Sequence, residues 1–405
     1  MASAIQTTCA IAGGGPAGMM LGLLLARAGV EVVVLEKHGD FLRDFRGDTI
    51  HPSTLEVMYE LGLLEEFLAR PHQEVRELEG WIGNTRVKIA DFSHLPTRCK
   101  FVALMPQWDF LDFLAGAARR YPAFRLMMNA NVTGLLRRDD RVVGLVFKSP
   151  DGPREIVAEL VVGADGRHST VRRAAGLNVE DLGAPMDVLW MRISKRPGDP
   201  DTVFGRIDAG RIMVLLDRGD YWQCAYVIPK DTFTAIRAAG LDAFRADVVR
   251  LVPFFAGRMG EIAGWHNVKL LTVAVDRLTD WARPGVLCIG DAAHAMSPIG
   301  GVGINLAIQD AVAAANYLQA PLRARTATLD HLRAVQQRRM FPTRVTQWAQ
   351  VVIQRRVITN VLARSEPLAV PWPVKLLQRF PYLRRIPARL VGLGVRPEHV
   401  GVGDR

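Results

Sequence analysis

The sequence predicts an α/β fold in three parts. These are a domain on a parallel sheet, a second domain with a mixed or antiparallel sheet, and a C-terminal helical segment. Three observations support this prediction: a strand–helix–strand pattern near the N-terminus, a run of short strands between residues 186 and 275, and an arginine-rich tail interrupted by prolines.

The N-terminal pattern begins with an apolar run at residues 8–12, which is typical of a strand. A glycine cluster follows, then an apolar helix at 17–28 that ends at Gly29, and a buried strand at 30–35. This βαβ unit predicts parallel strands and a Rossmann-like domain.

Later elements follow from apolar periodicity and turn residues. Helices are predicted at 53–70, 108–121 and 305–318, an alternating hairpin at 125–148, and strands at 160–163, 188–194, 202–207, 211–216, 221–229 and 286–289. Prolines are expected to break up the helical segment after residue 330, at Pro342, Pro367, Pro371, Pro373, Pro381 and Pro387.

The charge of the chain is concentrated at one end. The 405 residues carry a formal net charge of +10, yet residues 321–405 alone hold 16 basic and 4 acidic residues, a net +12. A basic surplus confined to the tail argues against reading the whole chain as a nucleic-acid binder. The hydrophobic content of 49% and charged content of 23% are those of an ordinary globular protein.

The four cysteines are far apart in the sequence, so no zinc-ligand spacing or redox pair is present and no metal site is expected. They indicate a reducing cytoplasm. No window of about 18 charge-free apolar residues suggests a membrane span.

The first chemical motif is Gly13-Gly14-Gly15-Pro16-Ala17-Gly18 between a strand and a helix. Its glycines allow a tight turn and close approach of a pyrophosphate to backbone N–H groups at a helix N-terminus. Glu36 ends the next strand, where its carboxylate can accept hydrogen bonds from a ribose and would repel a 2′-phosphate. The pattern predicts a site for FAD or NAD, the alternative being a purely structural glycine turn.

Two further motifs lie at strand-to-helix junctions. Asp165-Gly166 sits in the segment 162–172, and Gly290-Asp291 precedes the glycine loop 300–305. The helix N-terminus after that loop could stabilise negative charge on a bound ring, and Asp291 could hydrogen-bond a sugar-alcohol chain. Taken alone, Asp165-Gly166 is more typical of a tight turn, with Ser169 able to cap the helix that follows, and the Gly290-Asp291 segment could be a capped helix with a glycine loop.

The three motifs together resemble the class A flavoprotein monooxygenases, the p-hydroxybenzoate hydroxylase-like aromatic hydroxylases, over about residues 8–310. The resemblance implies FAD as cofactor, with the Asp165-Gly166 motif serving both FAD and the nicotinamide cofactor. The implied cofactor-binding residues are Gly13, Gly15, Pro16, Ala17, Gly18, Glu36, Lys37, Arg46, Gln107, Val132, Asp165, Gly166, Asp291, Gly301, Val302, Gly303, Ile304 and Asn305. Many members of the family have Gln where Val302 stands.

The resemblance also implies a division of the chain. Residues 1–75, 101–180 and 276–330 would form the FAD-binding domain, 76–100 and 181–275 the substrate domain, and 331–405 the basic helical C-terminal segment.

The function implied is a monooxygenase that uses NADH or NADPH and O2 to hydroxylate an aromatic, heteroaromatic or quinone-like molecule through a C4a-hydroperoxyflavin. Two alternatives stay open: another flavin reaction, such as polyprenyl reduction or halogenation, or flavin binding without turnover. The halogenase is disfavoured because residues 224–229 lack both tryptophans of its motif.

The sequence assigns no catalytic side chain. Pocket candidates are His51, Gln223, Tyr226 and Pro298, and a structural role is favoured for His294. One face of the strand 221–229 is expected to roof the flavin, with Gln223 on one face and Tyr226 on the other.

The basic tail has two interpretations. Its helices could cap the flavin domain with a solvated basic face, or attach the protein peripherally to anionic lipid at the inner face of the membrane.

Overall fold

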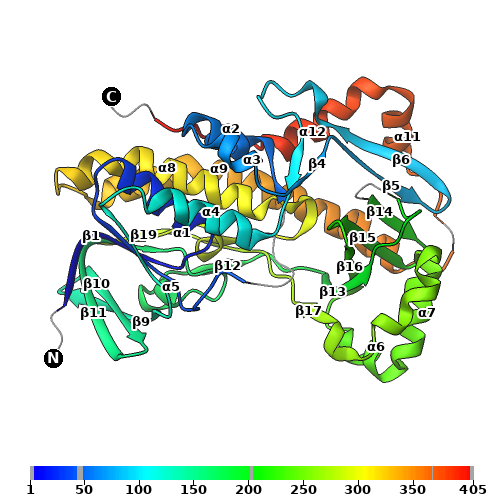
Figure 1. Cartoon of the computed structure of the whole chain (residues 1–405), viewed down its shortest axis with the longest axis horizontal. Helices are drawn as coiled ribbons and strands as arrows, with labels where there is room; N and C mark the ends of the chain where they lie inside the picture. Colours follow the sequence, from blue (N-terminus) through cyan, green and yellow to red (C-terminus); the bar gives the residue numbers. More distant parts are fainter. Residues whose placement is uncertain (1–3, 43–48, 201–203, 367, 402–405) are drawn as a thin grey trace.

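The computed structural model describes residues 4–42, 49–200, 204–366 and 368–401. An eight-stranded sheet built around parallel strands, with its helices, and a seven-stranded sheet lie at opposite ends of the molecule, and long helices run between them (Figure 1). The predicted α/β fold class is confirmed.

The parallel sheet has the order β19-β20-β11-β1-β2-β8. Its parallel strands are β1 (Ile5–Ala12), β2 (Val32–Leu35), β8 (Phe124–Met127), β11 (Gly152–Gly163) and β20 (Val286–Cys288). The carboxyl ends are in register, because Ala12 pairs with both Gly163 and Leu35. The loops after β1, β11 and β20 therefore leave the sheet at one edge, where α/β proteins bind ligands.

Residues 125–148 do not form one hairpin. The segment begins in β8, which pairs in parallel with β2, and only β9 (Asn131–Arg138) and β10 (Arg141–Ser149) form the hairpin, which turns at Asp139 with φ +52°. Phe124, Leu126 and Met127 of β8 pack, partly buried, against the core, a contact that alternation alone does not reveal.

Helices cover the parallel sheet. The α1 helix (Pro16–Arg27) contacts both α4 (Gln107–Ala118) and α8 (Gly303–Arg323), and ten of its twelve residues are buried. The α8 helix in turn packs on α9 (Leu329–Ile353). The predicted helix at 53–70 is split into α2 (Pro52–Glu60) and α3 (Leu64–Leu68), because Gly62 adopts φ +71° between them.

The seven-stranded sheet has the order β17-β13-β16-β15-β14-β5-β6. Two of them, β5 and β6, come from residues 77–91, far from the others in sequence, and β5 joins in parallel to β14. The strand bounds are β5 Glu77–Ile82, β6 Thr85–Asp91, β13 Met186–Ser194, β14 Phe204–Asp208, β15 Arg211–Asp217, β16 Tyr221–Pro229 and β17 Lys269–Leu271. The start of the predicted strand at 202 lies outside the described residues.

Short elements complete the body. They are β3 Thr49–Ile50, β4 Gln73–Val75, β7 Val102–Leu104, α5 Thr170–Ala174, β12 Val179–Asp181, α6 Phe233–Ala239, α7 Leu241–Leu251, β18 Asp276–Leu278, β19 Ala282–Arg283 and β21 His294–Ala295, with 3-10 turns at Phe92–His94, Pro253–Glu261, Trp265–Asn267, Gly290–Ala292 and Ile299–Gly301. No element was predicted between the strands at 221–229 and 286–289, and the helices α6 and α7 lie there. The α7 helix buries Phe244, Val248 and Leu251 on the outer face of the seven-stranded sheet.

The C-terminal segment continues from α9 through the π-helix η6 (Gln354–Ile358) into α10 (Thr359–Leu362). It ends with α11 (Trp372–Arg379), the 3-10 turn η7 (Pro381–Arg384) and α12 (Arg385–Gly392). Pro342 lies inside α9 without ending it. A proline costs an interior helix about 3 kcal/mol, which the burial of this helix offsets.

Candidate functional site

The first glycine turn brings two chain segments into backbone contact. The Gly13 N–H donates to the carbonyl of Leu35 at 2.8 Å, and Gly13 has φ +104°. A Cβ atom on Gly13 would lie 2.3 Å from the carbonyl oxygen of Ala164, in the loop after β11. A Cβ on Gly18 would likewise meet the Gly13 oxygen at 2.0 Å, so both positions require glycine.

Gly15 differs from its neighbours because no described atom lies within 4 Å of the place its Cβ would take. Pro16 and Ala17 follow as the first residues of α1, whose N–H groups point towards this open side. An open approach to a helix N-terminus is what a pyrophosphate needs, so the turn fits FAD.

Glu36 is fixed at the end of β2. Its carboxylate accepts hydrogen bonds from the N–H of Gly14 at 3.0 Å and of His38 at 3.1 Å, and the side chain is buried. The anionic carboxylate therefore stands beside the glycine turn, where the sequence pattern expects a ribose. Lys37 is exposed, and Val132 is buried in β9.

Asp165 acts as a helix cap. Its carboxylate accepts from the N–H of Thr170 at 2.7 Å and of Val171 at 3.2 Å, and it also bonds the hydroxyl of Ser169. Gly166 follows with φ +81°. The carboxylate therefore helps to hold the start of α5, and Ser169 caps that helix as predicted, accepting from the N–H of Arg172 at 2.9 Å.

The third motif packs against the first. Gly290 has φ +58°, and a Cβ there would lie 3.0 Å from that of Ala17 at the start of α1. Asp291 follows as an exposed residue at the same edge of the sheet. The loops after β1, β11 and β20 therefore meet, as their shared carboxyl edge predicts.

Hydrogen bonds hold the start of α8 against residues 49–54. The Asn305 amide donates to the carbonyl of Thr49 at 3.0 Å and accepts from the His51 N–H and the Thr54 hydroxyl, each at 2.8 Å. Gly301, with φ +61°, packs so closely that its Cβ would lie 2.2 Å from the Thr49 hydroxyl. These bonds use the side chain of Asn305. The four residues before it, Gly301, Val302, Gly303 and Ile304, lead into the buried helix.

His51 joins this loop to the C-terminal segment. The imidazole is 1% exposed, and its Nδ1 donates to the carbonyl of Val391 in α12 at 2.7 Å. Burial lowers the pKa of His51 to about 4, against the opposing effect of the carbonyls of Val391 and Gly300. The imidazole is therefore neutral at physiological pH.

The seven-stranded sheet turns one face towards the loop 297–301. That face carries Ala225 and Val227 of β16, which cluster with Ile299. Tyr226 points to the opposite face, where it packs on Phe244 of α7, and burial raises its pKa to about 12. The roof face is therefore the one that Gln223 shares.

The remaining predicted residues are placed as follows. Gln107 is half-buried at the first position of α4, Gln223 is buried and accepts from the Arg218 guanidinium at 3.3 Å, and Pro298 precedes Ile299 in the loop beside the sheet. Arg46 lies outside the described residues.

A buried ionic network under the third motif escaped the sequence analysis. Asp310 in α8 bonds the His294 Nε2 at 2.6 Å, the Gly290 N–H at 3.0 Å and the Arg339 guanidinium at 2.9 Å. Arg339 also pairs with Glu398 at 3.2 Å. Burial alone would raise the pKa of Asp310, but His294 and Arg339 lower it. His294 is thus structural, and spacing gives no signal for partners so far apart.

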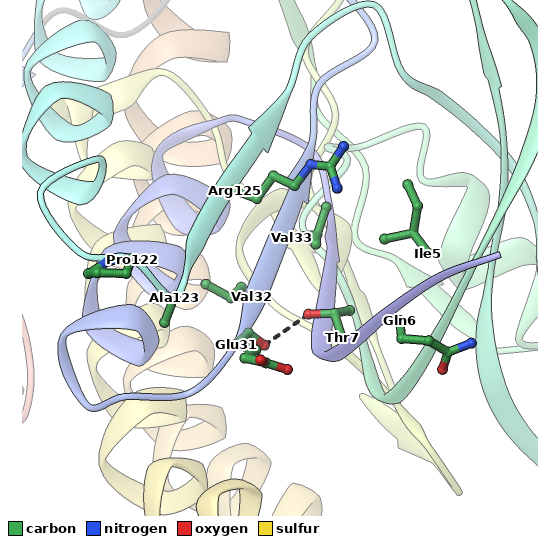
Figure 2. A pocket seen from close by; sticks show the side chains of 9 residues that line it. All are labelled: Ile5, Gln6, Thr7, Glu31, Val32, Val33, Pro122, Ala123 and Arg125. Atoms are coloured by element: carbon green, nitrogen blue, oxygen red, sulfur yellow. Dashed lines mark hydrogen bonds between the residues drawn. The ribbon is translucent and has the colours of Figure 1, made fainter. Parts of the chain in front are cut away.

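A shallow pocket lies at the other edge of the parallel sheet (Figure 2). It is lined by the first residues of β1, β2 and β8, including Thr7, Val32 and Arg125. Since these are amino ends of strands, the pocket is separate from the motifs. In the described ranges no group of His, Cys, Asp and Glu side chains could hold a metal ion.

Comparison with known proteins agrees with this geometry. The model of the FAD binding domain family matches residues 6–349. A 6-methylpretetramide 4-monooxygenase from Streptomyces rimosus is 31% identical over 394 residues, covering 96% of this chain and 93% of that protein. Two other relatives are matched over only 64% and 59% of their own length.

Two solved structures are also similar. The anhydrotetracycline hydroxylase OxyS from Streptomyces rimosus has a TM-score of 0.74 at 25% identity, covering 99% of this chain and 78% of that one. The p-nitrophenol 4-monooxygenase PnpA from Pseudomonas putida has a TM-score of 0.79 at 20% identity, covering 97% and 100%, which supports the fold. The chain therefore belongs to the FAD binding domain family, and it is a class A FAD-dependent monooxygenase, as its three motifs predict.

Proposed function

We propose that the protein uses NADH or NADPH and O2 to hydroxylate an aromatic, heteroaromatic or quinone-like small molecule. One observation supports this proposal most strongly. Three glycine-containing loops and the start of α8 meet beside an apolar face of the seven-stranded sheet. Relatives named for oxygenation of polycyclic or phenolic compounds support the substrate class.

In this proposal the FAD-binding domain comprises residues 1–75, 101–180 and 276–330, and the substrate domain comprises 76–100 and 181–275. The backbone of Gly13–Gly18 would hold the pyrophosphate and Glu36 the ribose. Asp291 would hold the ribityl region, and the backbone of 301–305 would face the ring. The open side of Gly15 and the buried carboxylate of Glu36 support this assignment.

Bound FAD would supply redox chemistry, taking a hydride from the nicotinamide and activating O2. The protein's part is to position the ring and the substrate and to exclude water. The start of α8 favours negative charge on the ring, and Asn305 holds that helix in place. The apolar residues Ala225, Val227 and Ile299 exclude solvent. The neutral His51 adds no charge near the loop.

The test is NADH and NADPH oxidation under air by the FAD-loaded protein, with a panel of phenols and quinones and with H2O2 measured alongside. A compound that stimulates nicotinamide oxidation and appears as its hydroxylated product, with little H2O2, is the expected result. Absence of flavin reduction by either nucleotide would contradict the proposal.

We also propose a cytoplasmic enzyme that contacts anionic lipid through its C-terminal segment. Residues 368–397 hold six basic residues and no acidic one. Their exposed apolar side chains are Trp372, Leu376, Phe380, Tyr382, Ile386 and Leu390. An apolar face bordered by Lys and Arg suits an interfacial helix. No helix of the described ranges is long and apolar enough to cross a membrane.

The same segment also caps the body. Ala388 is fully buried, and a Cβ on Gly392 would meet Leu95 at 2.8 Å. The inner face of α12 is therefore packed, and only the outer face is available to lipid. Deletion of the segment would expose the inner face as well, so point substitutions test the lipid contact better.

Co-sedimentation with phosphatidylglycerol vesicles at low salt should weaken in Trp372→Ser. The control is Trp348→Ser, which removes another exposed tryptophan from α9. Equal binding by both variants, or dimer formation through this face without vesicle binding, would contradict the lipid contact.

A further inference from the structure

One face of α9 carries buried glutamines that hold the loop 297–301 beside the seven-stranded sheet. Gln347 donates to the carbonyl of Ala295 at 3.1 Å. One turn later, Gln350 donates to the carbonyls of Ser297 and Ile299, each at 3.0 Å, and accepts from the Ser297 N–H at 3.1 Å. Both amides therefore fasten the segment that leads into the Gly300–Gly301 turn.

Gln354 is the next glutamine in this row, and its amide is different. The side chain is fully buried, yet neither its nitrogen nor its oxygen has a hydrogen-bond partner among residues 4–42, 49–200, 204–366 and 368–401. A buried amide without partners destabilises the fold, since it loses its bonds to water and gains none. Packing therefore gives no reason for a glutamine here.

The residues one turn before and after Gln354 place it between the loop 297–301 and the seven-stranded sheet. Gln350, four residues before it, reaches Ile299. Ile358, four residues after it, packs in the apolar cluster that contains Ile299, Val188 and Val227. Gln350 and Gln354 share a face of the helix, and Ile358, at the other end of the π-helix, still falls near that face. Gln354 therefore lies where the loop 297–301 and the roof face of the sheet meet.

The backbone at this point is also unusual. Gln354 begins the π-helix η6, and the α10 helix after it lies against β15 and β16 (Figure 1). The wider turn of a π-helix shifts side chains from the positions an α-helix would give, and such turns are frequent at functional sites.

We propose that Gln354 is a substrate-recognition residue, an inference that rests on the proposed function. Its amide N–H would donate a hydrogen bond to a substrate oxygen while its carbonyl accepts one from the same hydroxyl, which selects a group that both donates and accepts, such as a phenol or enol hydroxyl. The apolar neighbours Ile358, Val188 and Val227 would contact the carbon ring.

The test compares binding of 1-naphthol and naphthalene to the FAD-loaded protein, followed by the change in flavin absorption. The wild type should prefer 1-naphthol, and Gln354→Leu should lower this preference about tenfold, as expected for the loss of one or two hydrogen bonds. Naphthalene affinity should stay the same or improve.

The matched control is Gln378→Leu. The Gln378 amide already donates to the Lys88 carbonyl at 2.8 Å and accepts from the Lys88 N–H at 3.2 Å. This variant should keep the naphthol preference and lose thermal stability. Gln354→Leu should keep or raise the melting temperature, because it removes an unpaired amide.

Three results would overturn the inference: an unchanged preference in Gln354→Leu, a clear loss of its thermal stability, or no binding of either compound to the wild type. The proposed function is judged separately by nicotinamide oxidation. A weaker naphthol preference in a variant of a protein that never reduces FAD would leave the recognition role standing and remove the monooxygenase reaction.

Discussion

The two sides of the candidate site are built in different ways. The glycine edge around Gly13, Gly18 and Gly301 is made of backbone in close contact, with little contribution from side chains. The C-terminal side, from Arg339 to Glu398, is made of long polar side chains buried in pairs. The first side therefore depends on the absence of a Cβ atom, and the second depends on partners that are distant in the sequence.

The largest effect is expected on the C-terminal side. Arg339→Met would remove the buried cation that Asp310 and Glu398 share, at a cost of about 4 kcal/mol of unfolding free energy, measured by urea denaturation. Arg338→Met is the control: Arg338 bonds the same Glu398 at 2.7 Å but is partly exposed, so about 1 kcal/mol or less should be lost. Equal losses of unfolding free energy in the two variants would contradict the expectation that the buried ion pairs contribute more than the partly exposed one.

In the glycine edge, we expect a substitution of Gly13 to lower the free energy of unfolding. Gly13→Ala combines a positive φ with a contact of 2.3 Å to backbone, and we expect a loss of about 3 kcal/mol. Gly29→Ala shares the positive φ but has open space, so about 1 kcal/mol should be lost. If the two variants unfold at the same denaturant concentration, close backbone contact is not what Gly13 provides.

His51 joins the two sides and should make stability depend on pH. Its pKa is about 4 in the folded protein and about 6.5 when unfolded, so between these values only the unfolded chain takes up the proton. Stability should therefore fall as the pH is lowered, by about 2 kcal/mol from pH 6 to 4.5. His51→Asn, which can still donate to Val391, should flatten this part of the curve in denaturation series. An unchanged slope would assign it to other groups.

The smallest effect separates folding from cofactor binding. Gly15→Ala should fold normally, because Gly15 has φ −75° and no described atom near its Cβ position. The added methyl group would enter the space assigned to the pyrophosphate, and FAD affinity should fall about tenfold, or about 1.4 kcal/mol, in fluorescence titration. Gly116→Ala, on an exposed face of α4, should leave the affinity unchanged. Normal FAD binding by Gly15→Ala would move the pyrophosphate elsewhere.

The fold class and the family could be predicted from the sequence. Glycines that need positive φ, acidic residues at strand ends and the βαβ order are local features, and local backbone chemistry can be read from neighbouring residues. The motifs did not settle the role of the Asp165 carboxylate, which bonds its own helix start.

The other features follow from contacts between distant segments of the folded chain. One face of β16 lies towards Ile299, Arg339 pairs with Glu398 across 59 residues, His51 bonds Val391, and the amide of Gln354 has no described partner. Each depends on segments far apart in the chain, and periodicity carries no information about which distant segments meet. Burial makes these contacts strong, because low polarity increases the effect of each charge and each hydrogen bond.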